Sequence, residues 1–341
     1  MSFDPNAAAA SDSGIYGLPH GAAEAKVHVL PVPFDATTSY RDGTRHGPQA
    51  VLEASRQVDL FDLRNGKFYE RGIFMLPIPQ QILTLSDETR AFAEPVLDAG
   101  GVDANEPDLV AAAKAVNDRC ANLNDIVYNQ AKTILAQDKL LVTLGGDHAT
   151  PFGSIRAVAE RFPGVGILHL DAHADLRHQY EGFVWSHASI MDNVILRLPN
   201  VAKLVQVGIR DFCEQEYEAI RGSKNRIVTH FDQDVQDKLA RGVTFESIVD
   251  SIVAELPTHV YLSWDIDGLD PALCPTTGTP VPGGLSFHQA ICLLEGLIRA
   301  RKRIVGLDLC EVAPGANSEW DANVAARLLY KMIGYSLRTQ G

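Results

Sequence analysis

The chain has 341 residues, of which 46% are hydrophobic and 21% are charged. These fractions are ordinary for a globular protein and exclude a disordered, collagen-like or disulfide-scaffold chain. The formal net charge is −13, from 30 Lys and Arg against 43 Asp and Glu, which disfavours binding to a phosphate backbone, so nucleic acid is not expected as a partner.

The N-terminal residues 1–20 are expected to form a flexible tail, followed by a single domain over residues 21–341. The tail lacks the basic and apolar stretches of a secretory signal, and no segment approaches the roughly 18 apolar residues of a membrane span. The five cysteines form no CxxC pair and are expected to be buried, reduced thiols. These features predict a cytoplasmic protein with no membrane partner.

Short apolar runs alternate with longer amphipathic segments from Lys26 onward. The apolar runs predict strands covered on both faces, at Val27–Val32, Leu140–Leu144, Gly166–Leu170, Lys203–Ile209, Arg226–His230, Val260–Trp264 and Arg303–Leu309. The amphipathic segments predict helices at Pro48–Asp59, Pro107–Ala136, Pro151–Arg161, Phe245–Leu256 and Ser286–Ala300, with Thr244 and Ser286 as N-caps. This alternation predicts an α/β domain built on a doubly wound, mainly parallel sheet.

One segment, residues 77–110, does not fit this alternation. It contains Pro77, Pro79, Pro95 and the Gly100–Gly101 pair, and it is predicted to be an irregular excursion before the long helix. Its composition is consistent with either a surface insertion or a lid.

Side chains that can bind metal ions follow four of the predicted strands. They are Asp147 and His148 after the second strand, Asp171, His173 and Asp175 after the third, Asp265, Asp267 and Asp270 after the sixth, and Glu311 after the seventh. Because ligands bind at the carboxyl ends of parallel strands, these side chains should meet at one edge of the sheet. Alternate residues of an extended chain share a face, so the DxHxD and DxD motifs can each converge on one point.

Four carboxylates gathered at the end of a hydrophobic sheet would repel one another unless cations neutralised them. Mixed carboxylate and imidazole ligands suit Mn²⁺, Zn²⁺, Fe or Ni²⁺ better than Ca²⁺. Each motif alone is a weak signal, since a lone DxHxD can be a polar loop and GGDH a tight turn. Together they predict a site for two divalent ions. His169, between Leu168 and Leu170 in an apolar strand, is predicted to be a core histidine.

The order GGDH, DAHAD and SWDIDGLDP resembles the three metal-binding signatures of the ureohydrolases, the family of arginase and agmatinase. The similarity covers roughly residues 25–340 and includes GTRHGPQAVLEAS (Gly43–Ser55). It implies a three-layer αβα sandwich, an assembly of trimers or hexamers, and two ions, usually Mn²⁺, with Ni²⁺, Co²⁺ or Fe²⁺ as alternatives. The implied ligands are His148, Asp171, Asp175 and Asp265 for one ion, and His173, Asp171, Asp265 and Asp267 for the other.

The loop DLRHQYEGFVWSHASIM (Asp175–Met191) resembles that of agmatinases and lacks the Asn and Ser with which arginases hold arginine. Trp185 replaces a small or Tyr-like residue and, with Arg177, is a candidate substrate-binding residue. Arg177 has two interpretations of equal weight. It binds a substrate carboxylate, as in formiminoglutamase relatives, or it pairs with Glu181.

The resemblance implies hydrolysis of a guanidino group with release of urea, most like the conversion of agmatine to putrescine. Two metal ions would lower the pKa of a shared water toward about 7. Glu311 would hold the guanidinium, Asp267 would accept a proton, and His187 would pass one to the leaving amine. The alternatives are hydrolysis of guanidinobutyrate, guanidinopropionate, guanidine or formiminoglutamate, and a non-catalytic metal-binding homologue.

Overall fold

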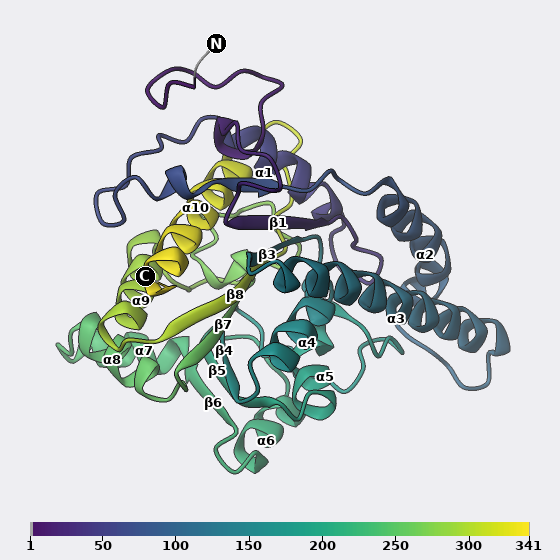
Figure 1. The fold of residues 1–341 in the computed structure, drawn as a ribbon. Helices are drawn as coiled ribbons and strands as arrows, with labels where there is room; N and C mark the ends of the chain where they lie inside the picture. Colours follow the sequence, from purple (N-terminus) through teal and green to yellow (C-terminus); the bar gives the residue numbers. More distant parts are fainter. Residues whose placement is uncertain (1–2, 341) are drawn as a thin grey trace.

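Eight strands form one fully parallel sheet in the computed structural model, which describes residues 3–340 (Figure 1). The strands are β1 Val27–Val32, β2 Ile73–Met75, β3 Leu140–Gly145, β4 Val165–Leu170, β5 Val201–Ile209, β6 Ile227–Phe231, β7 His259–Trp264 and β8 Arg303–Leu309. Their order across the sheet is β2-β1-β3-β8-β7-β4-β5-β6, so β3 and β4 are separated by the two last strands of the chain. All seven predicted strands are confirmed to within two residues, whereas the three-residue β2 was too short to produce a recognisable apolar run.

Helices cover both faces of the sheet and complete the predicted three-layer sandwich (Figure 1). One layer packs α1, α7, α8, α9 and α10 around one hydrophobic core, and the other packs α2, α3, α4 and α5 around a second. The helices are α1 Gly47–Ser55, α2 Gln80–Asp98, α3 Pro107–Ala136, α4 Phe152–Arg161, α5 Ile190–Arg197, α6 Glu214–Gly222, α7 Asp232–Ala240, α8 Phe245–Ala254, α9 Phe287–Arg299 and α10 Trp320–Gln340.

The continuous apolar runs of the strands are explained by this double cover. In β4, Ile167 packs into one core while the next residue, Leu168, packs into the other. Successive side chains of a strand point to opposite faces, so a strand between two helical layers needs an apolar residue at nearly every position. The carboxyl ends of the strands are left as the edge where polar residues can gather.

The predicted helix starts at Thr244 and Ser286 are confirmed by side-chain caps. Thr244 Oγ1 accepts a hydrogen bond from the Ser247 amide at 3.3 Å, and Ser286 forms a reciprocal capping box with Gln289. The long helix α3 has the predicted bounds, Pro107–Ala136, with its proline in the first turn. Helices α5, α6, α7 and α10 were not predicted.

The prediction of an irregular excursion over residues 77–110 is wrong for most of that segment, because α2 occupies Gln80–Asp98. Its buried face includes the small polar residues Ser86 and Thr89 between Ile82 and Val96, which weakened the apolar periodicity. Pro95 lies in the last turn, where it does not prevent the preceding turns from forming. The segment is therefore a regular helix packed on α3 and not an unstructured loop.

The boundary predicted for the N-terminal tail, at residue 20, lies too far along the chain. Ile15, Tyr16 and Leu18 are buried, and the Tyr16 hydroxyl donates a hydrogen bond to the Ala326 carbonyl of α10 at 3.0 Å. The Tyr16 amide also donates to Ser55 Oγ at 2.8 Å. The folded part of the chain therefore begins before residue 20.

All five cysteines are free, as predicted. Cys120, Cys274 and Cys310 are buried, and burial raises the pKa of each of these thiols. They therefore stay protonated at neutral pH and behave as small core residues.

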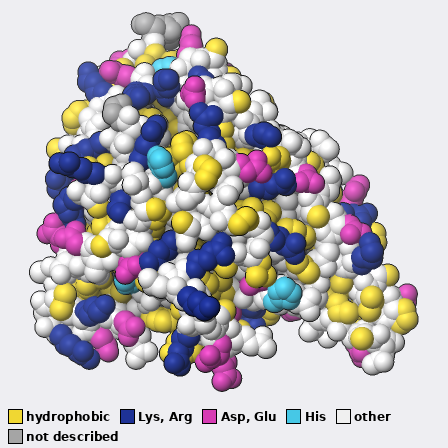
Figure 2. All heavy atoms as spheres, turned by 60° about the horizontal axis from the view of Figure 1, so that its bottom comes forward, with side chains coloured by type: hydrophobic (Ala, Val, Ile, Leu, Met, Phe, Trp, Pro, Cys, Tyr) yellow, Lys and Arg dark blue, Asp and Glu magenta, His cyan; other side chains and the backbone are white. Residues whose placement is uncertain are grey.

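The surface carries both signs of charge side by side. Figure 2 shows Lys and Arg side chains interspersed with Asp, Glu and hydrophobic side chains over the face it presents. Among the helices of residues 3–340, none is both long enough and apolar enough to cross a bilayer.

Candidate metal centre and active site

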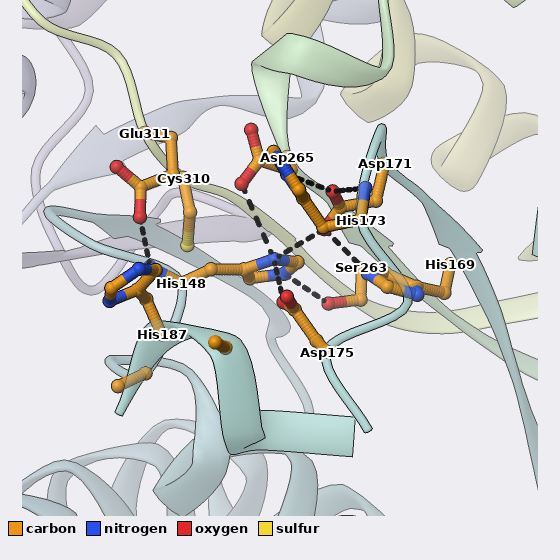
Figure 3. A network of polar contacts seen from close by, with 12 residues as sticks. His148, His169, Asp171, His173, Asp175, His187, Ser263, Asp265, Cys310 and Glu311 are labelled. Carbon is orange, nitrogen blue, oxygen red and sulfur yellow. Dashed lines mark hydrogen bonds and ion pairs between the residues drawn. The ribbon is translucent and has the colours of Figure 1, made fainter. Parts of the chain in front are cut away.

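The ends of β3, β4, β7 and β8 bring the predicted polar residues to one place (Figure 3). These four strands are neighbours in the order β3-β8-β7-β4, so residues far apart in sequence follow adjacent strand ends. The turn after β3 passes very close to another loop. A Cβ on Gly146 would lie 2.0 Å from the Phe34 carbonyl oxygen, so only glycine fits there.

His148 lies at the centre of the first half of the cluster. Its Nδ1 atom is 3.0 Å from Asp171 Oδ2, 3.2 Å from Asp175 Oδ2 and 3.5 Å from Asp265 Oδ2 (Figure 3). All four side chains are buried. These are the four residues that the resemblance assigned to one ion.

His173 forms the second half of the cluster with two carboxylates. Its Nδ1 atom is 3.1 Å from Asp267 Oδ2 and 3.4 Å from Asp171 Oδ1. Asp265 joins this half through its Oδ1 atom, which accepts a hydrogen bond from the Asp267 amide at 2.8 Å. Asp171 therefore directs one oxygen toward each histidine, an arrangement that suits a carboxylate shared by two ions.

The electrostatics of the cluster require a counter-charge. Burial, with the neighbouring Asp171 charge, raises the pKa of Asp175 to about 7. Burial and the Asp267 charge likewise raise the pKa of Asp265, and burial and Asp147 raise that of Glu311. Because a divalent cation removes this repulsion and prefers mixed oxygen and nitrogen ligands, the donor set fits divalent metal ions.

Two residues of the site adopt left-handed backbone conformations that side chains rarely tolerate. Asp175 has a φ of 54° and Glu311 a φ of 62°. Glu311 is fixed by its surroundings, since its Oε1 atom accepts a hydrogen bond from the His148 amide at 2.8 Å. Such strain is characteristic of positions where a precise side-chain direction is required.

A second set of buried polar residues supports the histidines. His148 Nε2 is 3.0 Å from Ser263 Oγ, which donates to Asp308 Oδ1 at 3.1 Å.

Asp147 accepts hydrogen bonds from Thr37 and from the Ala149 amide, as expected of a turn residue. The exposed Asp270 accepts from the Ala272 amide at 2.8 Å and is a turn residue as well.

The prediction of His169 as a simple core histidine is incomplete. The residue is fully buried in β4, but its Nε2 atom lies 2.9 Å from Asp171 Oδ2. Its position two residues before Asp171 places it on the same side of the strand, because alternate residues of a strand share a face. Sequence reasoning missed this contact because Leu168 and Leu170 made the surroundings appear wholly apolar.

A cavity of about 170 Å³ opens onto the cluster. His173 and Asp175 form part of its wall, together with His187 and the Asp267 partner Thr279, whose Oγ1 atom is 3.4 Å from Asp267 Oδ2. The remaining lining residues are Ser39, Arg177, Tyr180, Ala188, Asp211, Phe212 and Glu216.

Several of these lining residues were not predicted from the sequence. Asp211 and Glu216 follow the carboxyl end of β5, so the strand-end rule used for the other strands would have pointed to them. Ser39 and Thr279 lie on loops with no motif that marks them. Thr279 is nonetheless in a Gly- and Pro-rich stretch after the SWDIDGLDP motif.

Arg177 does not pair with Glu181. Its Nε atom lies 3.8 Å from Glu216 Oε2, and its guanidinium lies over the Tyr180 ring at 4.8 Å. Glu216 is itself held by two backbone amides, of Leu176 at 3.0 Å and Cys213 at 2.8 Å. Arg177 therefore lies in the cavity wall with Glu216 as its carboxylate partner.

Trp185 and Glu311, both predicted to contact the substrate, lie outside the cavity lining. Trp185 packs its ring against Phe152, with centroids 4.9 Å apart, and carries the Arg197 guanidinium 4.8 Å above it. It therefore serves the packing between α4 and α5 in this structure. Glu311 lies next to the cluster, on the opposite side from His169 in Figure 3, and is also not part of the lining.

His187 lies in the cavity wall, on the short helical turn His187–Ser189. Burial, reinforced by the nearby His173, lowers the pKa of His187 to about 4. The ring is therefore neutral at pH 7 and can accept a proton.

The parallel αβα fold and the buried carboxylate–imidazole cluster define a metal-dependent hydrolase of the ureohydrolase type. The model of the arginase family matches residues 25–334, and the chain belongs to this family. Its members are hydrolases of amidino compounds, and this chain is one of them.

The chain is similar to several relatives that carry names. The chain is 35% identical to N(1)-aminopropylagmatine ureohydrolase of Thermus thermophilus, over 91% of this chain and 90% of that one. It is 34% identical to agmatinase of Edwardsiella ictaluri, over 89% of this chain and 85% of that one. Its fold is similar to the crystal structure of agmatine ureohydrolase of Thermoplasma volcanium, with a TM-score of 0.73, 24% identity, and coverage of 96% and 94%.

Proposed function

We propose that this protein hydrolyses the guanidino group of a small cationic amine, with agmatine as the best candidate, and releases urea. The observation that carries the proposal is the buried cluster of four aspartates and two histidines that opens onto the cavity. Membership of the arginase family and the similarity to agmatinases support the same chemistry.

The cluster would hold two divalent ions, and Mn²⁺ is the ion we propose, from the family resemblance and the mixed ligands. One ion would bind His148, Asp171, Asp175 and Asp265, and the other His173, Asp171, Asp265 and Asp267. When bound, two such ions supply a hydroxide nucleophile at neutral pH.

Three residues of the chain would act on the substrate. Glu311 is a buried carboxylate whose pKa is raised by burial and by Asp147, and a planar guanidinium is a natural ligand for it. Asp267, held by Thr279 and by the Ala172 amide, would accept a proton at Oδ2. His187, neutral at pH 7, would take up a proton and pass it to the departing amine.

The charges around the cavity favour a substrate with a cationic tail. Asp211 is an exposed carboxylate on the cavity wall, and Glu216 and Arg177 offset each other nearby. The outer wall is therefore acidic, which attracts a second ammonium and repels a carboxylate. Agmatine meets this requirement, whereas guanidinobutyrate, guanidinopropionate and formiminoglutamate do not.

A second candidate substrate is N(1)-aminopropylagmatine, which has a longer cationic tail. The observation that favours it is the 35% identity to the Thermus thermophilus enzyme of that name. Trp185 is directed away from the cavity lining, so no bulky ring narrows the entrance at that position.

Urea release by the Mn²⁺-loaded protein tests the proposal directly. We expect the highest kcat/KM for agmatine or N(1)-aminopropylagmatine and little turnover of guanidine or of the acidic substrates. The variant Asp211→Asn should raise KM for the cationic substrates by about 3- to 10-fold, because it removes one exposed charge contact. Activity confined to an acidic substrate would reject the proposal.

The proposal also covers the oligomeric state, the cellular location and the partners of the enzyme. By family resemblance we propose a homo-oligomer, a trimer or hexamer, in the cytoplasm. The expected partner is the small guanidino substrate alone, with neither nucleic acid nor a membrane.

A further inference from the structure

A chain of buried hydrogen bonds leads from Asp171 across the sheet to β6. It passes through His169 on β4 and Gln206 on β5 and ends at Thr229 on β6. His169 and Gln206 are fully buried. Asp171 is the one residue in this series of hydrogen bonds that the proposed function also uses.

The orientation of the Gln206 amide is fixed by a backbone carbonyl. Gln206 Nε2 donates to the Ala174 carbonyl at 2.7 Å, and the Thr229 hydroxyl donates to Gln206 Oε1 at 2.9 Å. A carbonyl oxygen can only accept, so the NH₂ end of the amide must face Ala174. Exchange of the amide nitrogen and oxygen would place two acceptors against each other.

This orientation determines which nitrogen of His169 carries the proton. The second N–H of Gln206 points to His169 Nδ1 at 3.0 Å, so Nδ1 must be the accepting, unprotonated nitrogen. The proton of the neutral ring is then on Nε2, which donates to Asp171 Oδ2 at 2.9 Å. A protonated Nε2 cannot bind a metal ion, although its distance to the other ligands would allow it.

Both oxygens of Asp171 are thereby held by donors. Oδ2 accepts from His169, and Oδ1 accepts from the His173 amide at 2.6 Å. The carboxylate cannot rotate without breaking one of these bonds. Its two oxygens stay directed toward the two halves of the cluster.

We propose that His169 is a positioning residue that holds the Asp171 carboxylate in its bridging orientation, and that Gln206 fixes the His169 tautomer required for this. The inference rests on the metal centre of the proposed function and is independent of the substrate. Removing such a partner of a ligand typically weakens metal binding by about 10- to 100-fold.

The test measures Mn²⁺ binding to the metal-stripped full chain by titration calorimetry. We expect His169→Phe to weaken Mn²⁺ binding by about 10- to 100-fold, and Gln206→Leu to weaken it by a smaller factor. His169→Gln should restore most of the affinity, because its amide nitrogen supplies a donor near the Nε2 position. The matched control is His28→Phe, which removes another buried strand histidine whose Nε2 lies against the Ala22 carbonyl, far along the chain from the cluster.

Nitrogen-15 spectra of the histidine side chains give a second readout that does not depend on metal or activity. They should show His169 as the Nε2–H tautomer in the parent chain and a mixture of tautomers in Gln206→Leu. Mn²⁺ affinity equal to that of the parent in His169→Phe would overturn the proposal. Equal losses in His169→Gln and His169→Phe would overturn it too, because that result identifies the ring as a direct ligand.

If His169→Phe does not fold, the Gln206→Leu and His169→Gln variants still decide the question. The outcome also separates this inference from the proposed function. A parent chain that binds Mn²⁺ and loses affinity in these variants, yet releases no urea from any guanidino compound, supports the role of His169 and rejects the proposed function.

Discussion

At the scale of single residues, the site is built from carboxylates that are individually unfavourable where they lie. Asp175, Asp265 and Glu311 are buried, and each has a raised pKa because of burial and of the other carboxylates. Folding brings these groups together only because the large hydrophobic layers on both sides of the sheet stabilise the chain as a whole. Electrostatic repulsion among these carboxylates destabilises the cluster, and a bound cation would reduce that repulsion.

Asp267 contacts His173 in the cluster and Thr279 of the cavity wall, and it is the proton acceptor in the proposed mechanism. Asp267→Asn should lower kcat for urea release by about 10²- to 10⁴-fold, the usual contribution of a positioned proton acceptor. Steady-state kinetics and a thermal melt of the variant check this. The matched control is Asp270→Asn, an exposed turn residue on the same loop, which should keep parent kinetics. Parent-like turnover in Asp267→Asn would contradict the mechanism.

His187 gives a pH dependence whose sign follows from its pKa. The pKa of about 4 in the folded chain is below the ordinary value of 6.5, so between pH 6.5 and pH 4 the unfolded chain binds a proton that the folded chain does not. The stability of the parent is therefore lost as the pH falls through this window. Bound metal ions would lower the pKa further and leave the sign unchanged.

In urea unfolding at several pH values, the free energy of unfolding of His187→Phe should fall less steeply from pH 6.5 to pH 4 than that of the parent. Above pH 7 the two curves should run parallel, because the histidine is neutral in both states. Parallel curves over the whole range would show that His187 titrates normally.

At the scale of elements, α2 and the start of α3 support the two loops that border the cavity. Arg90 on α2 donates to the Thr38 carbonyl at 2.6 Å, and Ser86 donates to Asp35 Oδ1 at 3.2 Å. On the other side, Asn117 of α3 donates to the Gly182 carbonyl at 3.0 Å and accepts from the Val184 amide at 2.8 Å. Helix α2 therefore supports the loop that contains Ser39, and α3 supports the loop that contains Tyr180.

Arg90→Ala should loosen the loop over residues 35–45 without disturbing the metal cluster. We expect a loss of about 1–2 kcal/mol in the free energy of unfolding from the broken hydrogen bonds. We also expect faster hydrogen exchange of the Gly43 and Arg45 amides, which Asp35 holds. KM should rise more than kcat falls.

Lys114→Ala is the matched control for Arg90→Ala, because it removes a cation that pairs with Asp118 on the exposed side of α3. It should change neither exchange nor KM. An Arg90→Ala variant with unchanged exchange at Gly43 and Arg45 would show that α2 does not support the loop.

The elements that sequence could predict are those with strong local signals. The strands have unbroken apolar runs, and α3, α8 and α9 have proline or serine and threonine starts. Helix α2 escaped prediction because two polar residues lie on its buried face. The Ser86 hydroxyl donates to Asp35, and the Thr89 hydroxyl donates to the Leu85 carbonyl of the same helix, so the apolar periodicity is interrupted. The grouping of the carboxylates and histidines was predictable, because the motifs after β3, β4 and β7 fix the residue types and their spacing.

The cavity wall was less predictable, for a physical reason. Arg177 pairs with Glu216, 39 residues away in sequence, and not with Glu181, four residues away. The segment between Arg177 and Glu181 is not a helix, and Asp175 and Glu181 both have left-handed backbone conformations. An i,i+4 argument applies only within a helix. The contacts of Trp185 with Phe152 and Arg197 are likewise tertiary.

At the scale of the whole molecule, metal ions bound by residues from several strand ends should stabilise the folded chain against unfolding. Ions bound only by the folded chain stabilise it by about 2.7 kcal/mol per site at 100 times the Kd. Mn²⁺ should therefore raise the Tm by several degrees, and EDTA should reverse the change. Ca²⁺ at the same concentration should have a smaller effect, because it prefers ligands that are all oxygen.

Asp175→Asn provides the control for this experiment. It removes one proposed ligand and part of the repulsion, so the metal-free variant should melt at or above the temperature of the metal-free parent. The increase caused by Mn²⁺ should be smaller in the variant. An equal Mn²⁺ effect in both proteins would show that the ions stabilise the chain at another place.

The strand order has a consequence for the time at which the site can exist during synthesis. His148 follows β3, and Asp171 follows β4, but β7 and β8 of the C-terminal third fill the two positions between them. Without these strands, β3 and β4 would stand three strand spacings apart, about 14 Å. A nascent chain that has emerged only as far as β6 therefore holds four of the six proposed ligands and lacks Asp265 and Asp267. The proposed metal site would therefore be complete only after β7 and β8 insert at the centre of the sheet.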